Sequence, residues 1–181
     1  MDIYDTTELE VTLENGGVVV MPTDTVYGLV SSANTPSAVK RMYEIKQRSG
    51  KPGTIIAGSV QQLVNMGFSQ AELETASQFW PGPVSVILSA SDNLDYLHMG
   101  KKSLAVRVPD IEWIHKLLLQ TGPLATTSAN LPGEPTATNI VQAKRTFGVK
   151  IDFYLDGGEI INKPSKIVHT LKGGETEILR L

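Results

Sequence analysis

Apolar and polar positions along the chain form alternating blocks that predict helices and strands in turn. Residues 6–15 carry leucines one turn apart after a Thr6 cap and stop at two glycines, which predicts a short helix. The apolar run over 18–21 predicts a buried strand. A second helix is predicted with Pro36 in its first turn and a narrow apolar face.

The alternation continues along the rest of the chain. It predicts further strands near 54–57, 84–88, 104–108, 124–127, 153, 167 and 178, and further helices after Ser59 and over about 70–79, 111–120 and 139–147. Strands that alternate with helices are typical of an α/β sheet. No repeat, low-complexity tract or linker interrupts the pattern, so we expect one domain over residues 1–181.

Composition and charge narrow the class of protein. With 41% hydrophobic and 19% charged residues, the 181-residue chain has the composition of an ordinary globular protein. No apolar run is long enough to cross a bilayer, and the N-terminus is acidic where a secretory signal would be basic. We therefore expect no membrane contact and a cytoplasmic location. The absence of cysteine excludes disulfides, thiolate metal sites and a cysteine nucleophile.

A net charge of −3 provides no general attraction to nucleic acid, but one segment is strongly basic. Residues 40–51 contain five cations and a single acid. Cations at the end of a helix are commonly solvated, which accounts for Lys40 and Arg41. Lys46 and Arg48, two residues apart in an extended segment, would project on one side and hold a carboxylate or phosphate together.

The predicted strand over 18–21 runs into the segment PTDTVYG, which places hydroxyls, a carboxylate and a phenol together. The threonines and the aspartate have a local interpretation, because such residues form turns through hydrogen bonds to nearby backbone. The functional interpretation rests on the residues that follow. Tyr27 offers a flat face with a hydroxyl, and Gly28 permits a close approach of backbone or ligand. These residues alone leave both interpretations open.

Two later segments add donors for an anion. Arg107 lies among apolar neighbours in LAVRVPD, where a guanidinium is usually paired with a structural partner or an anionic ligand. The segment TTSANLPGEPT is either a polar loop that caps a helix or a concave set of N–H groups and hydroxyls for phosphate oxygens. Since all three segments follow or end strands, we expect their polar groups to gather at strand ends.

Several standard signatures are absent. The sequence has no phosphate loop of the form GxxxxGK[ST], no strand-bound GxGxxG, no HExxH and no GxSxG elbow. His98, His115 and His169 are far apart and lack the spacing of metal ligands. We therefore assign no metal to protein ligands.

The polar segments occur together in one known family. GGVVVMPTDTVYGL, IKQRSGK, FWPGPVSVIL, LAVRVPD, GPLATTSANLPGEPT and the closing PSKIVH…ILR follow the order found in the YrdC-like family, the threonylcarbamoyl-AMP synthases. The resemblance covers nearly the whole chain. It implies an α/β fold with a twisted mixed sheet, flanking helices and a large central cavity. It also implies the short form of the family, without an extra C-terminal domain.

The resemblance implies an enzyme that converts L-threonine, bicarbonate and ATP, with Mg²⁺, into threonylcarbamoyl-AMP and pyrophosphate. A downstream tRNA threonylcarbamoyl transferase would consume the product, and tRNA or double-stranded RNA is a further implied contact. Mg²⁺ would be held mainly by the ATP phosphates and water. Positioning and charge neutralisation dominate such phosphoryl chemistry, so a scarcity of histidine is compatible with it.

The same resemblance implies roles for individual residues. Lys46 and Arg48 match the family's K-x-R pair and are the candidate catalytic residues. The candidate ligands of threonine and bicarbonate are Thr23, Tyr27, Arg107 and Ser165. The candidate ligands of ATP are Arg48, Ser128, Asn130, Thr136 and Arg180.

Two departures from the family pattern leave alternatives open. RSGKPGT replaces the family's R-P-x-x-N-P turn, and Lys166 and His169 replace a threonine and an aspartate near the end. One alternative is an RNA-binding module that uses residues 40–51 and forms no adenylate. The lack of an aromatic-rich stacking motif and the negative net charge weigh against it. The other is a relative whose cavity takes a different carbamoyl or carboxylate substrate.

Overall fold

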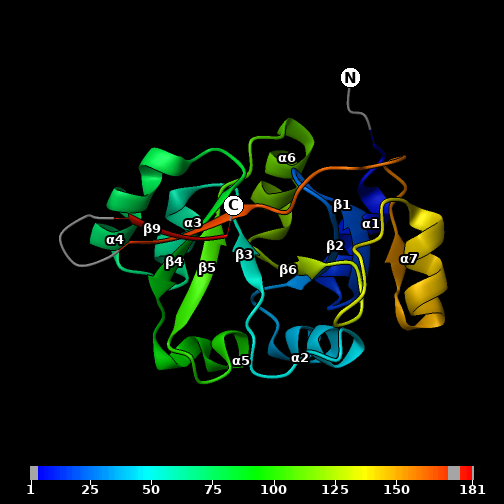
Figure 1. The fold of residues 1–181 in the computed structure, drawn as a ribbon, viewed down its shortest axis with the longest axis horizontal. Coiled ribbons are helices and arrows are strands. Elements are labelled where there is room, and N and C mark those ends of the chain that lie inside the picture. Colours follow the sequence, from blue (N-terminus) through cyan, green and yellow to red (C-terminus); the bar gives the residue numbers. More distant parts are fainter. Residues whose placement is uncertain (1–3, 171–175, 181) are drawn as a thin grey trace.

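The computed structural model describes residues 4–170 and 176–180 as helices packed on one sheet (Figure 1). The α-helices are α1 (Thr7–Glu14), α2 (Pro36–Ile45), α3 (Val60–Asn65), α4 (Gln70–Ala76), α5 (Asp95–His98), α6 (Glu112–Thr121) and α7 (Ile140–Phe147). The strands are β1 (Val18–Pro22), β2 (Tyr27–Ser32), β3 (Thr54–Ile56), β4 (Val84–Ser89), β5 (Ser103–Arg107), β6 (Leu124–Ser128), β7 (Phe153–Tyr154), β8 (Lys166–Thr170) and β9 (Thr176–Arg180).

The strands form a nine-stranded sheet in the order β7-β1-β2-β6-β3-β5-β4-β8-β9. β1 and β2 form an antiparallel hairpin, and β6 pairs antiparallel with both β2 and β3. β3 pairs in parallel with β5, and β4 pairs in parallel with β8. The predicted α/β fold, a twisted mixed sheet flanked by helices, is confirmed (Figure 1).

Side chains cap the starts of α3 and α7, at Ser59 as the sequence predicts and at Asn139, which the sequence analysis placed inside the helix; Thr6 makes no capping hydrogen bond with its side chain. The Ser59 hydroxyl accepts a hydrogen bond from the Gln62 N–H at 3.3 Å, and the Asn139 side chain accepts one from the Gln142 N–H at 3.0 Å. Each side chain satisfies one of the first N–H groups of its helix, α3 or α7. Helix α2 starts at Pro36, whose fixed φ suits the first helical position.

The sequence analysis missed strand β2 and the short helix α5. β2 lies in the segment that we interpreted as the polar exit from a single strand, and it pairs back onto β1. All six of its residues are buried, so it shows no alternation of apolar and polar positions. The polar PTDT segment is therefore the turn of a hairpin.

The two faces of the sheet have different covers. Alternate strand residues such as Val20 and Ala125 pack on one face with residues of α2, α3, α4, α5 and α7. Residues of opposite parity, such as Val30 and Leu124, pack on the other face with residues of α1 and α6. Figure 1 shows α2 and α6 on opposite sides of the central strands.

Helices α1 and α6 cover only part of their face of the sheet. Their core includes described residues of β1, β2, β3 and β6, but no described residue of β4, β5 or β8. Beyond the two helices, the strands carry small or hydroxyl-bearing side chains on this face, among them Gly28, Thr54, Ser103 and Thr126, and these line a pocket. The incomplete helical cover therefore decides where the pocket lies.

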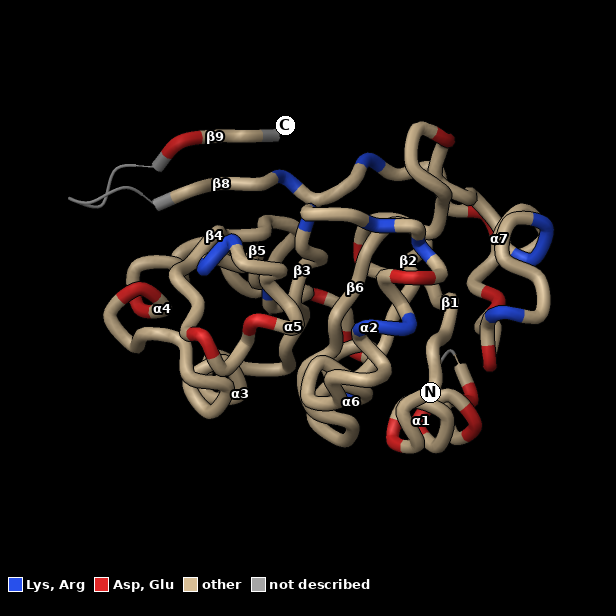
Figure 2. The backbone as a smooth tube through the Cα atoms, turned by 90° about the horizontal axis from the view of Figure 1, so that it is seen from below, with Lys and Arg blue, Asp and Glu red and all other residues tan. Residues whose placement is uncertain are grey.

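Charged residues are unevenly placed over the described part of the chain. Figure 2 shows acidic residues on α1, whose first turn carries Glu8 and Glu10, on the side of the molecule away from β8. The strand β8 begins with Lys166.

Among the helices within residues 4–170 and 176–180, none has the length and apolar character that spanning a membrane requires.

Candidate functional site

A pocket of about 590 Å³ lies over the uncovered part of the sheet. It is lined by residues of the β1–β2 turn, the segment 48–54, strands β5 and β6, and the residues that lead into β8. Five residues that the sequence analysis assigned to ligand binding are among them: Thr23, Arg48, Arg107, Ser128 and Ser165. The fold therefore brings these residues together from distant parts of the chain.

Strand pleating explains why β5 supplies polar groups to the pocket. Ser103, Ala105 and Arg107 line the pocket, whereas Leu104 and Val106 lie in the core on the other face. Successive residues of a strand point to opposite faces, so alternate positions share one environment. The same rule places Thr126 and Ser128 of β6 toward the pocket, and Thr127, near the end of that strand, lines it as well.

The pocket also contains residues to which the sequence analysis gave no individual role. Thr25, Lys51 and Thr126 lie in the polar and basic segments that it singled out, whereas Thr54, Lys101 and Ser103 were missed. The alternation of small polar and apolar residues in SLAVR was a signal for Ser103. No comparable signal existed for Lys101, which follows α5 and reaches the pocket only because β5 lies beside β3 and β4.

The pocket has a strongly cationic lining. Arg48, Lys51, Lys101 and Arg107 line it, and no aspartate or glutamate is among its described lining residues. Threonine and serine hydroxyls lie between the cations. This combination of charges and donors is suited to carboxylate and phosphate groups.

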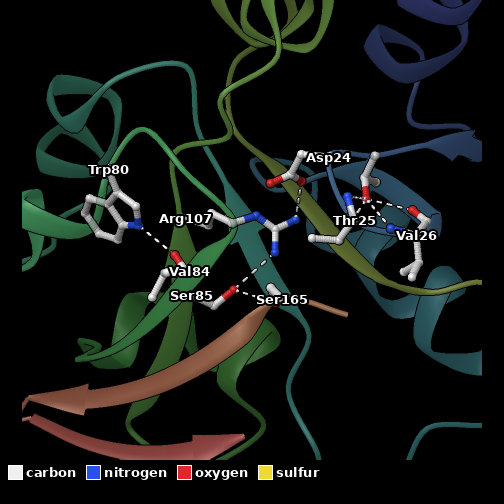
Figure 3. Close-up of polar contacts among 9 residues, drawn as sticks. Asp24, Thr25, Val26, Trp80, Val84, Ser85, Arg107 and Ser165 are labelled. Carbon is white, nitrogen blue, oxygen red and sulfur yellow. Dashed lines mark hydrogen bonds and ion pairs between the residues drawn. The ribbon is translucent and has the colours of Figure 1, made fainter. Parts of the chain in front are cut away.

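Arg107 is buried, and its contacts with other side chains include those to Asp24 and Ser85 (Figure 3). Its Nη2 donates to the Asp24 carboxylate at 2.8 Å, and its Nη1 donates to the Ser85 hydroxyl at 3.2 Å. Ser85 Oγ lies 3.1 Å from Ser165 Oγ, which extends the contacts to the segment before β8. Burial raises the pKa of the Asp24 carboxyl above its ordinary value, while Arg107 opposes this shift.

Thr23 uses its hydroxyl to shape the β1–β2 turn. Its Oγ1 donates to the Val26 carbonyl at 2.7 Å and accepts from the N–H groups of Thr25 and Val26, each at 3.2 Å. The local interpretation of PTDT, a turn formed by hydrogen bonds to nearby backbone, therefore holds for the Thr23 hydroxyl. Thr23 also lines the pocket, so the β1–β2 turn forms part of the pocket wall.

Lys46 lies outside the described lining of the pocket and binds a neighbouring loop. Its Nζ donates to the Ser128 carbonyl, the Asn130 carbonyl and the Asn130 Oδ1, each at 2.6 Å. Burial lowers the pKa of Lys46 to about 8, and the nearby positive charge of Arg48 acts in the same direction. Lys46 thus shapes the end of β6, which presents Ser128 to the pocket.

Arg48 lines the pocket and also joins two of its walls. Its Nη1 donates to Thr127 Oγ1 at 2.6 Å and its Nη2 to the Pro52 carbonyl at 2.5 Å. Its Nε donates to the Lys51 carbonyl. We predicted that Lys46 and Arg48 would hold one anion together, but the structure directs Lys46 to carbonyl oxygens and leaves Arg48 at the pocket.

Three other predicted site residues, Tyr27, Asn130 and Thr136, lie outside the described lining of the pocket. The Tyr27 hydroxyl donates to the Gly158 carbonyl and accepts from the Gly157 N–H, both at 2.8 Å, away from the pocket lining. Asn130 supports the Ser128 loop, and Thr136 is half-buried outside the described lining. The backbone of Arg180, in β9, pairs with Ile167 of β8, and the Arg180 side chain is outside the described part of the structure.

The prediction that the polar groups meet at strand ends is wrong for Arg107. β6 runs antiparallel to β3, and β5 runs parallel to β3, so β5 and β6 end at opposite edges of the sheet. The long Arg107 side chain instead reaches across the face of the sheet to Asp24 (Figure 3). A rule for parallel sheets fails here because the sheet is mixed.

The basic segment 40–51 is divided between different roles. Arg41 pairs with Asp152, Lys46 is buried, and Arg48 and Lys51 line the pocket. The cations of this segment therefore have separate partners and do not act as one basic group. Among the described residues, no group of three or more His, Asp or Glu residues could hold a metal ion.

The chain matches over residues 11–181 the family model for Sua5, YciO and YrdC proteins, whose description is "Telomere recombination". The chain belongs to the Sua5/YciO/YrdC family. Its polar segments pointed to this family, and that prediction is confirmed.

Similar Sua5/YciO/YrdC members carry the name threonylcarbamoyl-AMP synthase. The Vibrio campbellii protein of that name is 34% identical over 163 residues, which are 86% of this chain and 88% of the relative. The Pyrococcus abyssi protein of that name is 37% identical over 153 residues, which are 81% of this chain. The alignment covers 45% of that longer relative.

Solved structures of the family share the fold. P. abyssi Sua5 complexed with L-threonine is 33% identical with a TM-score of 0.85, over 96% of this chain and 52% of that chain. Escherichia coli YciO is 24% identical with a TM-score of 0.80, over 96% of this chain and 86% of that chain. At that lower identity, the likeness to YciO shows the fold alone.

Proposed function

We propose that this chain is a threonylcarbamoyl-AMP synthase, which forms threonylcarbamoyl-AMP and pyrophosphate from L-threonine, bicarbonate and ATP. The observation that carries the proposal is the pocket lined by Arg48, Lys51, Lys101 and Arg107 without a described acidic residue. Its volume of about 590 Å³ lies in the range for small-molecule sites. The relatives named threonylcarbamoyl-AMP synthase support the choice of reaction.

The reaction divides into two bond-forming steps. The neutral amine of threonine bonds to the carbon of bicarbonate, and loss of water leaves a carbamate. A carbamate oxygen then bonds to the α-phosphorus of ATP while the bond to pyrophosphate breaks. Cationic side chains near the amine favour its neutral form and stabilise the charge that develops on the phosphates.

We assign the threonine part of the pocket to Thr23, Arg107 and Ser165, which lie on the β1–β2 turn, β5 and the segment before β8. We assign ATP to Arg48 and Ser128. Asn130, Thr136 and Arg180 remain proposed nucleotide ligands beside these two. Lys46 acts in this proposal through the Ser128 loop, and Tyr27 through the backbone at Gly157 and Gly158.

Mg²⁺ would enter with ATP. The described lining offers hydroxyls and carbonyls but no carboxylate, so the residues present do not form a protein cage for this ion. The proposal also includes two partners, a tRNA threonylcarbamoyl transferase that consumes the product and a contact with RNA. It further includes a single domain over residues 1–181 and a cytoplasmic location.

One experiment tests the function directly. Purified protein is mixed with ATP, Mg²⁺, bicarbonate and L-threonine, and the mixture is analysed for threonylcarbamoyl-AMP by mass spectrometry. We expect the product to require all of these components, with ¹³C from labelled bicarbonate in the carbamoyl group. If threonine and bicarbonate cause no product and no pyrophosphate release above background, the assignment fails. A different amino acid as the substrate would support the alternative carbamoyl chemistry.

A further inference from the structure

Asp24 is a buried carboxylate that contacts the pocket only through another residue. Its side chain is 5% exposed, and it is absent from the described lining of the pocket. Its Oδ1 accepts from Arg107 Nη2 at 2.8 Å, and Arg107 does line the pocket. Asp24 is therefore placed to affect a ligand through the position of the Arg107 guanidinium.

The Asp24 contact belongs to a chain of side chains that crosses the sheet. Arg107 Nη1 donates to Ser85 Oγ at 3.2 Å, and Ser85 Oγ lies 3.1 Å from Ser165 Oγ (Figure 3). Asp24 comes from the β1–β2 turn and Ser85 from β4, so the guanidinium is held from two separate elements. Contacts from two directions define the plane of a guanidinium, whereas one contact would allow it to swing.

Burial of the Asp24 carboxylate in this position costs free energy, because the group loses its hydration. Its Oδ2 accepts no hydrogen bond from any described residue, although it is buried. Burial raises the pKa of the Asp24 carboxyl despite the attraction of Arg107. An incompletely satisfied buried ion pair is weak as a source of stability, because the loss of hydration offsets the attraction between the charges. Its presence is better explained by the arrangement that it imposes on Arg107.

We propose that Asp24 is a positioning residue, which orients the Arg107 guanidinium so that it meets the planar carboxylate or carbamate group of the threonine substrate. This inference rests on the proposed function. A guanidinium recognises a planar CO₂⁻ group through its own plane, so its orientation determines both affinity and the placement of the reacting oxygen. Asp24 also offsets one positive charge in a pocket that carries three other cations, Arg48, Lys51 and Lys101.

The test compares steady-state kinetics of Asp24→Ala and Asp24→Asn with the unchanged protein. We expect Asp24→Ala to lower kcat/KM for threonine by about 100-fold, because a shift of about 1 Å in a positioning group has effects of this size. The KM for ATP should change less than about twofold, since the nucleotide residues are elsewhere in the pocket. Asp24→Asn keeps the shape and one acceptor oxygen, so it should recover part of the loss.

Asp5→Asn is the matched control. Asp5 is exposed and accepts a hydrogen bond from the Thr7 N–H at 3.1 Å, so this variant also removes a negative charge but lies outside the described pocket lining. Its kinetics should equal those of the unchanged protein. An Asp24→Ala variant that loses stability but keeps the threonine KM and kcat would overturn the proposal. If Asp24→Ala does not fold, the threonine kinetics of Asp24→Asn and Ser85→Ala are compared with those of the unchanged protein instead. Unchanged kinetics in both variants would overturn the proposal.

A second measurement separates failure of this proposal from failure of the proposed function. Phenylglyoxal modifies accessible arginines, and peptide mass spectrometry compares the rate at Arg107 with that at the exposed Arg145. We expect Asp24→Asn to accelerate modification of Arg107 severalfold and to leave Arg145 unchanged. If the unchanged protein forms no threonylcarbamoyl-AMP, this result still decides whether Asp24 holds Arg107. If it forms the product but neither threonine kinetics nor labelling responds to Asp24→Asn, only the positioning role is refuted.

Discussion

The Lys46 ammonium lies 2.6 Å from both the main-chain carbonyl and the side-chain Oδ1 of Asn130. A third bond reaches the Ser128 carbonyl at the same distance. The end of α2 is thereby joined to the end of β6, although the two residues of the first pair are 84 positions apart. This lysine is directed to the protein itself, and the pocket beside it depends on the loop that it holds.

Removal of the Lys46 ammonium should destabilise the protein. In Lys46→Met, the acceptors on Ser128 and Asn130 lose a common donor, and we expect the free energy of unfolding to fall by about 2–3 kcal/mol. Urea unfolding followed by circular dichroism measures this change. Lys40→Met is the control, since Lys40 lies on the same helix but is exposed, and it should change stability by less than about 0.5 kcal/mol. Equal stability of the two variants would contradict the role of Lys46.

The low pKa of Lys46 should appear in the pH dependence of stability. Burial lowers this pKa from 10.5 to about 8, so between these values the unfolded chain binds more protons at Lys46 than the folded chain does. Stability from this group therefore increases as the pH rises from 8 to 10.5, with a slope on the order of 1 kcal/mol per pH unit. Over this range the stability difference between unchanged protein and Lys46→Met should widen. A constant difference would show that Lys46 titrates normally.

Loss of Arg48 should abolish the reaction without unfolding the chain. Arg48 lines the pocket and bonds Thr127 and the Pro52 carbonyl, so Arg48→Ala removes the proposed phosphate contact and loosens the wall around it. We expect threonine- and bicarbonate-dependent pyrophosphate release to fall by more than about 100-fold. Arg48→Lys should not restore it, because an ammonium cannot replace the planar fork. Arg145→Ala, on the exposed face of α7, should retain activity; full activity of Arg48→Ala would refute the assignment.

Gly28 should tolerate no larger side chain. A Cβ at this position would lie 2.8 Å from Thr126 Oγ1 and 3.0 Å from Thr23 Cγ2, and all three residues line the pocket. We expect Gly28→Ala to lower the free energy of unfolding by about 1–3 kcal/mol and to raise the KM for threonine. A second substitution, Thr126→Ala, removes the closest clashing atom.

Part of the stability lost in Gly28→Ala should return in the Gly28→Ala/Thr126→Ala double variant. A double-mutant cycle in urea measures this coupling, which should be about 0.5 kcal/mol or more for residues in contact. Strictly additive effects would mean that the two side chains do not meet.

The contact between Arg41 and Asp152 should affect stability alone. Asp152 bonds both Arg41 and the Val18 N–H, which joins α2, β1 and the segment before β7. The pair is about 40% exposed, so solvent screens it, and Asp152→Ala should cost only about 1 kcal/mol. The KM for ATP and for threonine should not change. A kinetic effect of Asp152→Ala would indicate that Arg41, from the basic segment 40–51, takes part in the functional site.

Local features of the chain were sufficient to predict most helices and strands. Capping side chains at Ser59 and Asn139, and Pro36 at a helix start, act within a few residues of their own position, so their effect can be read directly from the sequence. β2 was missed because a strand buried along its whole length gives no alternating signal. The α/β class and the family followed from the order of the segments.

The roles of the polar residues could not be assigned in the same way. Lys46 and Arg48 are equally plausible anion ligands in the sequence, yet one is bonded to carbonyl oxygens and the other lines the pocket. Arg107 lies at the opposite edge of the sheet from the other strand ends, and Asp24 emerges as its partner only after the sheet is assembled.

The sequence by itself therefore determined most of the elements, the fold class and many of the polar residues from which a site is built. Only the tertiary structure decided which of those residues share the pocket, which support it, and that Asp24 holds Arg107. Helix caps and strand periodicity depend on neighbours along the chain. The site depends instead on strand order and on the incomplete cover provided by α1 and α6, which arise from contacts between residues far apart in sequence.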